Sequence, residues 1–254
     1  MNSRERILAK LSGQPVDQLP NMAITMMFAS AQNGSRYLDY ATDYRVLAAA
    51  QLRTSEVFGI DHVSVISDPA VEAADCGAEV RYYDDQPPAI DESAALFADK
   101  GALLQFGAPA PTSGRRMSNR IHGVELIKSC VGKDKLVEGW IEGPCAEGSD
   151  LRGINNLMLD CIDDPPFVMD LFEVIVQMQI PFAQAQIEAG ADLIGIGDAA
   201  ASLVGPAIYD ELVWSYEKRL VDAIHTMGAR VRLHICGNTR RILKSMGTLG
   251  CDMA

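Results

Sequence analysis

Short apolar runs alternate along this chain with longer segments of helical periodicity. The longer segments place apolar residues three and four positions apart over more than ten residues, which is typical of amphipathic helices. Strands separated by such helices cannot form hairpins and instead pair in parallel through right-handed crossovers. The pattern therefore predicts an α/β fold with a parallel sheet. The apolar runs of strand length lie near residues 21–27, 62–67, 136–142, 192–197 and 230–236.

The remaining segments add little to the predicted core. Residues 4–11 form a short amphipathic helix, and "AEVRYYDDQPPAI" suggests a short strand and a turn. The last residues, "GCDMA", read as the opening of a sixth strand. Because chain termini are normally loose and exposed, a core strand at the last residue is unusual. We therefore expect residues 1–254 to be a single domain that lacks its last strands.

Composition narrows the class of protein. The chain has 254 residues, 48% of them apolar, which is ample for a sizeable core. Its net charge of -12 disfavours nucleic acid, whose binders need a basic face. No continuous apolar run reaches the roughly 18 residues of a spanning helix, and the charged, periodic start is unlike a signal peptide. We expect a cytoplasmic protein with no nucleic-acid and no membrane partner, and the oligomeric state stays open.

Polar side chains cluster at the ends of the predicted strands. Asp68, Glu142, Asp198, His234 and Cys236 all fall at carboxyl ends. In α/β folds this is the edge of the sheet where ligands bind and reactions occur. A doubly wound sheet and an eight-stranded barrel both fit this arrangement.

The stretch "RVRLHICGNTRRIL" carries the clearest candidate chemistry. His234 and Cys236 are two apart at a strand end and therefore point to the same face. Imidazole and thiolate are both good zinc ligands. Two ligands do not make a site, and a satisfied histidine beside a packed thiol is the simpler interpretation. No pair of cysteines has CxxC spacing, so free thiols are expected at the other positions, which are 76, 130, 145, 161 and 251.

Several stretches together resemble the uroporphyrinogen decarboxylase family, which also contains zinc-dependent corrinoid methyltransferases. They include "RERILAKLSGQPVDQLP", "FGIDHVSVISDPAVEAADCGAEVRY", "QIEAGADLIGIGDAAASLVGP" and "LHICGNTRRIL". The resemblance runs from about residue 4 to the end. It implies a distorted (β/α) barrel of TIM type, of which about three of the eight strands would be absent here.

Two places indicate the branch of the family. The decarboxylases carry a basic "RQAGR"-type segment after the first strand that binds substrate carboxylates, whereas this chain has "ITMMFASAQNGSRY". The methyltransferase branch has an HxC motif, matched here by "HIC" at 234–236. The resemblance thus implies methyl transfer from a methylated corrinoid, a cobalamin on a carrier protein, to a small thiol activated by zinc. His234 and Cys236 would be metal ligands, with a third protein ligand beyond residue 254.

The same resemblance implies roles for the other polar residues. Asp68 and Asp198 would be catalytic, and Glu142 and Asn238 would bind substrate, with Glu142 alternatively an acid or ligand near the zinc. For both aspartates, capping of the following helix is the competing interpretation. Cys251 is a weaker candidate ligand, because it begins its strand and would lie at the opposite rim of a barrel.

Two other functions stay open. The chain could be a metal-free decarboxylase of tetrapyrroles in porphyrin biosynthesis, or a non-catalytic barrel that binds a ligand or partner. A dinucleotide site is disfavoured, because "GIGDAAAS" has Ala200 where the third glycine of the phosphate-binding pattern would stand.

Overall fold

The computed structural model describes all 254 residues. Its centre is a four-stranded parallel sheet in the order β1-β4-β5-β6, and a separate two-stranded antiparallel sheet pairs β2 with β3. The strands are β1 (His62–Ser64), β2 (Val80–Arg81), β3 (Ala89–Ile90), β4 (Leu136–Glu142), β5 (Leu193–Gly197) and β6 (Arg230–His234).

Helices make up most of the rest of the chain. The α-helices are α1 (Ser3–Leu11), α2 (Met26–Asn33), α3 (Tyr37–Thr42), α4 (Tyr44–Val57), α5 (Ala70–Cys76), α6 (Arg115–Val131), α7 (Pro144–Arg152), α8 (Ile154–Asp163), α9 (Pro165–Glu188), α10 (Pro206–Ile208), α11 (Trp214–Thr226) and α12 (Leu243–Met246). A π-helical turn, Tyr209–Val213, joins α10 to α11, and short 3-10 turns lie at Glu92–Ala94, Lys100–Gln105 and Ala199–Ser202.

Four of the five predicted core strands are confirmed as parallel neighbours, but the strand predicted at 21–27 is wrong. Helix α2 begins at Met26, and residues 21–25 form no strand. That segment runs beside β1 with a single backbone hydrogen bond, from the amide of Asp61 to the carbonyl of Asn21, at 2.8 Å. A short apolar run fits either a buried strand or a buried helix segment, and α2 forms here by packing on α4.

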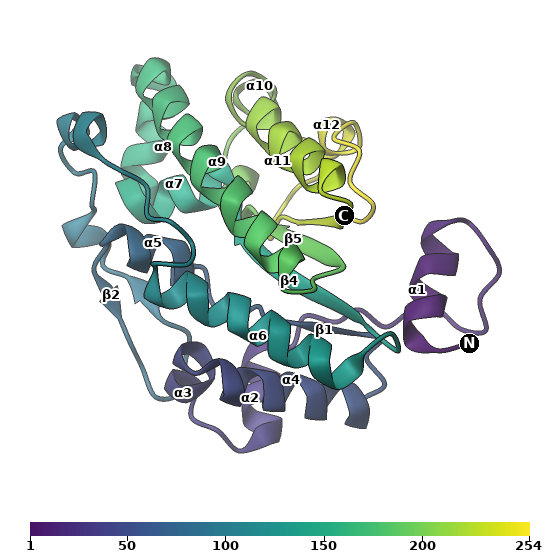
Figure 1. Ribbon diagram of the computed structural model, residues 1–254. Coiled ribbons are helices and arrows are strands. Elements are labelled where there is room, and N and C mark those ends of the chain that lie inside the picture. Colours follow the sequence, from purple (N-terminus) through teal and green to yellow (C-terminus); the bar gives the residue numbers. More distant parts are fainter.

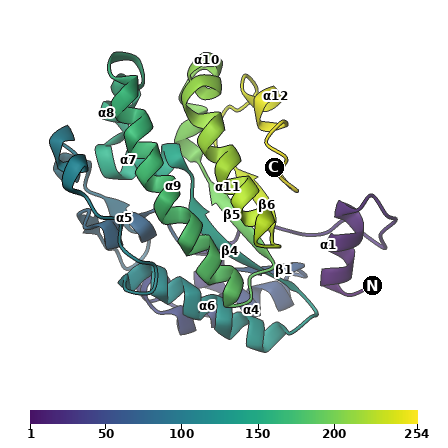
Figure 2. The ribbon, with the colours of Figure 1, turned by 45° about the horizontal axis from the view of Figure 1, so that its top comes forward.

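In β1, β4 and β6 most polar side chains lie on one face of the main sheet and most apolar ones on the other, whereas β5 carries no polar side chain. One face packs against α4, α6, α9 and α11, which follow one another around the sheet in the order of its strands (Figures 1 and 2). The opposite face is polar, which is unusual for a buried sheet. The apolar face carries Val63, Val137, Ile141, Ile194, Ile196, Val231 and Leu233. The polar face carries His62, Ser64, Glu138, Trp140, Glu142, Arg232 and His234, together with the leucines Leu136 and Leu193.

The two ends of the chain are attached differently. Helix α1 stands apart from the other helices (Figure 1), and Arg4 reaches Asp192 at 2.7 Å. At the other end, Met253 forms a parallel bridge with Arg232 beside β6. The predicted opening of a sixth strand is therefore present as a single bridge.

Helix α9 is the one helix long and apolar enough to span a membrane by length and composition, although it contains no uninterrupted apolar run of that length. Of its most apolar 18-residue window, 56% is buried inside the molecule. It packs on β4, β5 and α11. The core helix of a globular protein has the same character.

Candidate functional site

His234 and Cys236 meet at the carboxyl end of β6. Nε2 of His234 lies 3.0 Å from Sγ of Cys236, so the predicted convergence of the two side chains is what the structure contains. Glu142 is the last residue of β4, which lies on the other side of β5 from β6. Because Gly197 of β5 pairs with both Glu142 and His234, these two residues lie at the same height along the sheet. Three of the residues singled out in the sequence therefore share one edge of the sheet.

Trp140 fills the space between these strands because β5 presents glycine on this face. A Cβ atom at Gly195 would lie 2.3 Å from the indole ring of Trp140, and one at Gly197 would lie 3.0 Å from Oε2 of Glu142. The indole Nε1 donates a hydrogen bond to Oε1 of Glu142 at 2.9 Å. The glycines thus allow the indole to lie flat on the strand and hold the carboxyl group of Glu142.

A buried group of charged side chains, formed by His62, Glu138 and Arg232, lies on the same face of the sheet, further from the carboxyl ends of the strands. Glu138 is fully buried, with His62 at 3.1 Å and Arg232 at 3.3 Å. Burial opposes ionisation, but His62 and Arg232 hold the pKa of the Glu138 carboxyl below its usual value. Burial, together with the positive charge of Arg232, lowers the pKa of His234. A neutral imidazole is the form that binds a metal ion.

A pocket of about 340 Å³ opens beside Cys236. Its polar lining comes from Glu142 of β4, from Ser149 and Asp150 of α7, and from Ser202. Its apolar lining includes Ile154 and Leu203. Neither Asp68, Asp198 nor Asn238 is among the residues that line it.

Four carboxyl groups form a buried acidic cluster next to this pocket, which we define as Glu72, Glu142, Glu147 and Asp150. Oε1 of Glu72 accepts the backbone N–H of Glu142 at 2.9 Å. Both carboxyl oxygens of Glu147 and Oδ2 of Asp150 are buried without a hydrogen-bond partner. Buried polar groups of this kind are rare in proteins and call for an explanation.

Burial and mutual repulsion raise the pKa values of all four carboxyl groups of the acidic cluster. Burial raises the pKa of Glu72 to about 7. Burial, reinforced by the charge of Glu72 and of Asp150, raises the pKa of Glu142 and of Glu147 well above the usual range. For Asp150, burial and the charges of Glu72 and Asp68 raise the pKa in the same way. Like charges crowded together in a low dielectric cannot all ionise.

Asp198 caps α7, the helix that contributes Ala146, Ser149 and Asp150 to the pocket lining. It is fully buried, and its carboxylate accepts the backbone N–H groups of Ala146 at 2.6 Å and Cys145 at 3.3 Å, in the first turn of α7. Burial raises the pKa of Asp198 to about 6, and its neighbour Glu217 is also shifted upward, by burial and by Asp198. The structure thus places Asp198 at a cap, although of α7 rather than of the segment that follows it.

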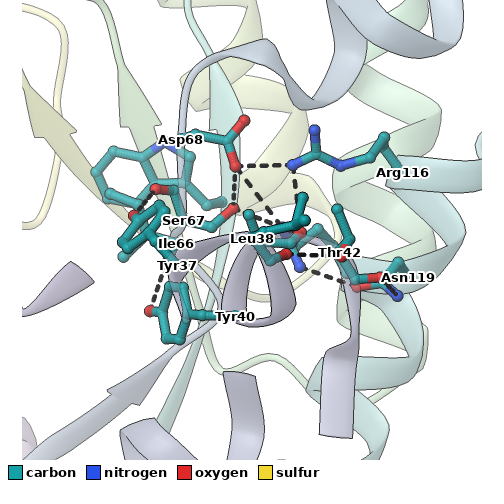
Figure 3. A network of polar contacts seen from close by, with 12 residues as sticks. Tyr37, Leu38, Tyr40, Thr42, Ile66, Ser67, Asp68, Arg116 and Asn119 are labelled. Carbon is teal, nitrogen blue, oxygen red and sulfur yellow. Dashed lines mark hydrogen bonds and ion pairs between the residues drawn. The ribbon is translucent and has the colours of Figure 1, made fainter. Parts of the chain in front are cut away.

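Asp68 belongs to a neighbouring polar network rather than to the pocket. Its Oδ2 accepts hydrogen bonds from Arg116 at 2.7 Å and from the Ser67 hydroxyl at 2.6 Å (Figure 3). Arg120 lies 3.8 Å away and is also buried. Two arginines therefore share one carboxylate, and their charge is directed at Asp68.

The remaining candidates lie apart from the pocket. Asn238 is exposed, and its side chain accepts the backbone N–H of Arg240 at 3.3 Å. Cys251 is half-buried, its pKa is raised to about 12 by burial, and it precedes a segment that pairs with the amino-terminal half of β6. Cys145 and Cys161 are buried free thiols in the core, whereas Cys130 is exposed.

The chain supplies two donors for a metal ion. No group of three or more His, Cys, Asp or Glu side chains is arranged to bind one. An imidazole and a thiol 3.0 Å apart match the donor chemistry of zinc and cover half of its tetrahedral shell. The residues present therefore fit part of a zinc site.

Sequence reasoning missed Glu72, Glu147 and Asp150. The available signal was "EGPCAEGSD", in which Glu147 and Asp150 are three residues apart directly after a core strand. Three residues is one helical turn, so both carboxyl groups fall on one face of α7.

Comparison with known proteins gives consistent matches along the whole chain. A family model described as "Uroporphyrinogen decarboxylase (URO-D)" matches residues 2–254. The methylcobamide:CoM methyltransferase MtbA of Methanosarcina mazei is 27% identical over 98% of this chain and 74% of its own length. The methylcobamide:CoM methyltransferase MtaA of Methanosarcina barkeri is 25% identical over the same shares.

Two further matches bear on the branch and the fold. A uroporphyrinogen decarboxylase of Sulfurimonas denitrificans is 23% identical over 73% of this chain and 55% of its own. A solved methyltransferase from Methanosarcina mazei superposes with a TM-score of 0.90, over 100% of this chain and 75% of that one, at 24% identity. The last match establishes the barrel-type fold.

Proposed function

The chain belongs to the uroporphyrinogen decarboxylase (URO-D) family, and we propose that it is a methyltransferase that moves a methyl group from a methylated corrinoid to a thiol. The observation that carries the proposal is the pair His234 and Cys236, whose donor atoms lie 3.0 Å apart beside a pocket large enough for a small thiol. Relatives that carry the name methylcobamide:CoM methyltransferase align over 98% of the chain, which supports this branch.

Zinc is the proposed metal. His234 and Cys236 would hold it, and the third protein ligand is proposed to come from sequence beyond residue 254. When bound, zinc would lower the pKa of an incoming thiol so that it reacts as thiolate at neutral pH. The lowered pKa of His234 supports ligation, because its ring is then neutral without competition from a proton.

In the proposed reaction the thiolate sulfur donates an electron pair to the methyl carbon. The carbon–cobalt bond breaks with its electrons remaining on cobalt, so methylcob(III)alamin leaves as cob(I)alamin and the thiol becomes a methyl thioether. The thiol proton passes to solvent. The pocket beside Cys236 would orient the thiol, and Glu142, held by Trp140, would border the reacting sulfur.

In this proposal Asp198 and Asp68 do not touch the substrate but position residues that line the pocket. Asp198 positions α7, and hence Asp150, through its cap. Asp68 orders Arg116 and the loop before Pro69, which lines the pocket. Asn238 would contact substrate from the exposed loop after Cys236. We propose that the corrinoid arrives on a separate carrier protein in the cytoplasm.

Metal content tests the zinc site. We expect near-stoichiometric zinc by mass spectrometry in the full-length protein, purified without chelators, and a large loss in Cys236→Ala. Cys130→Ala, which removes an exposed thiol on α6, serves as the matched control and should retain the metal. Residues 1–254 alone should bind zinc weakly, because two donors leave half of the shell to water. Equal metal in Cys236→Ala and the parent, or none in either, would refute the site.

A further inference from the structure

A buried chain of polar side chains connects α11 to the amino-terminal end of α7. The hydroxyl of Tyr209, in the π-helical turn, donates a hydrogen bond to Oε2 of Glu217 on α11. Glu217 in turn faces the carboxyl group of Asp198 within hydrogen-bonding reach. Asp198, Tyr209 and Glu217 are all fully buried. The chain thus begins at a π-helical turn, a rare feature that is frequent at functional sites.

The contact between the two carboxyl groups requires a proton. A carboxylate only accepts hydrogen bonds, so two carboxylates in contact would repel each other in a buried site. Both oxygens of Asp198 already accept backbone N–H groups, whereas Oε1 of Glu217 has no donor. The other titratable groups near Glu217 are Cys145 and Cys251, which are neutral thiols because burial raises their pKa values. The proton therefore belongs on Glu217, which donates it to Asp198.

Asp198 is also held from two other sides. Its backbone N–H donates to the carbonyl of His234 at 2.9 Å. Gly143 precedes α7, and a Cβ atom there would lie 2.5 Å from the side chain of Asp198. The carboxylate of Asp198 accepts the first N–H groups of α7. A shift of Asp198 would therefore move both the start of α7 and the carboxyl end of β6, which border the pocket.

We infer that Glu217 is a positioning residue of the proposed methyl-transfer site: as a neutral acid it donates a hydrogen bond to Asp198 and so fixes the start of α7 relative to the end of β6. The inference rests on the proposed function for the reaction that the site performs. The hydrogen bond itself belongs to the fold and can be measured without any reaction.

Infrared spectroscopy tests the proton on Glu217. At neutral pH, the difference spectrum between the full-length parent and Glu217→Gln should contain the carbonyl band of a carboxylic acid, which a carboxylate does not show. Glu211→Gln, on the exposed side of the same π-helical turn, is the matched control and should leave that band in place. A difference spectrum that contains only carboxylate bands would overturn the inference.

Two substitutions separate the hydrogen bond from the space that the side chain fills. Glu217→Gln keeps an oxygen that accepts from Tyr209 and gains an amide N–H that can donate to Asp198. Glu217→Met is of similar size but does neither, so it leaves buried partners unpaired. Hydrogen exchange of the Cys145 and Ala146 amides should accelerate by roughly tenfold or more in Glu217→Met and stay near the parent rate in Glu217→Gln. Equal exchange in the two variants, or fast exchange in Glu217→Gln, would refute the role of the donor.

Kinetics of the full-length protein link this hydrogen bond to the reaction. With free methylcobalamin as donor and coenzyme M, the thiol in the names of the relatives, as acceptor, KM for the thiol should rise several-fold in Glu217→Met and stay near the parent value in Glu217→Gln. Zinc content should be kept in both, because α7 lines the pocket whereas the proposed ligands lie on β6 and just after it. An unchanged KM in Glu217→Met would overturn the positioning role.

The outcomes separate the inference from the proposed function. Absence of methyl transfer in the parent would contradict the proposed function, whereas the acid band and the exchange rates would still decide whether Glu217 holds Asp198 and α7. If Glu217→Met does not fold, the band and the exchange rates of Glu217→Gln alone decide the inference.

Discussion

At the scale of single residues, the acidic cluster has the largest consequence for stability. Glu72 is buried and its pKa is raised from 4.5 to about 7, so the folded protein binds this proton over a pH range where the unfolded chain has released it. Stability from this group is therefore fully present below about pH 4.5 and is lost as the pH rises through 7.

We expect Glu72→Gln to remove that pH dependence. The amide keeps an acceptor oxygen for the backbone N–H of Glu142 but cannot ionise. Between pH 5 and pH 7, the free energy of unfolding of the parent should fall by about 2 kcal/mol more than that of the variant. Urea denaturation at the two pH values measures this, with Glu56→Gln on the exposed face of α4 as control. A parallel pH dependence in parent and variant would show that Glu72 ionises normally.

Residue-scale prediction from sequence succeeded where backbone geometry alone decides the outcome. Alternation along a strand placed His234 beside Cys236, and the ends of parallel strands brought Glu142 to the same edge. It did not reveal that the carboxylate of Asp198 would cap α7, because the cap joins segments 52 and 53 positions apart. Such contacts depend on tertiary packing that periodicity does not encode.

At the scale of elements, β5 shows how one strand shapes its neighbours. Its glycines at 195 and 197 leave the space that the indole of Trp140 occupies. A side chain at either position would move the indole and, through its hydrogen bond, Glu142.

Gly195→Ala is expected to destabilise the protein by about 1–3 kcal/mol, because the new Cβ would overlap the Trp140 ring and force it from its position. Gly107→Ala, where a Cβ meets nothing within 4 Å, is the matched control and should change stability little. Urea denaturation and near-ultraviolet circular dichroism of the tryptophans report the two effects. An alanine tolerated at 195 with an unchanged tryptophan spectrum would refute this packing.

Elements with a clear period were predicted well, and those without one were missed. The start of α9 shows a local signal of this kind, since Asp164 accepts the N–H of Phe167 and prolines occupy the first turn. Helix α7 was missed because its residues are buried all round, including Glu147 and Ser149, which leaves no amphipathic pattern. The apolar run at 21–27 was ambiguous because it is short and continuous. Such a run fits both the two-residue period of a strand and the 3.6-residue period of a helix.

At the scale of the whole molecule, charge separates the two branches of the family. The chain carries a net charge of -12, and the pocket beside Cys236 is acidic. Uroporphyrinogen carries many carboxylates and needs bidentate cationic partners. Of the three buried arginines here, Arg116 and Arg120 lie in the Asp68 network, and Arg152 pairs with Asp160.

We therefore expect no decarboxylation of uroporphyrinogen by the full-length protein. The measurement is chromatographic analysis of porphyrin products after incubation and oxidation, with an authentic decarboxylase as the positive control. Stepwise loss of carboxyl groups at an enzymatic rate would contradict the assignment to the methyltransferase branch.

Because the main sheet has one polar and one apolar face, the register of its strands is strongly specified. Because side chains alternate with a period of two, slipping one strand by a single residue would turn its charged residues toward the helices and its valines and isoleucines toward the polar interior. For β4 this would bury Glu138 among apolar side chains and strip it of both His62 and Arg232. An unpaired buried charge costs several kcal/mol. The polar face therefore disfavours misaligned pairings of β4 within the folded sheet.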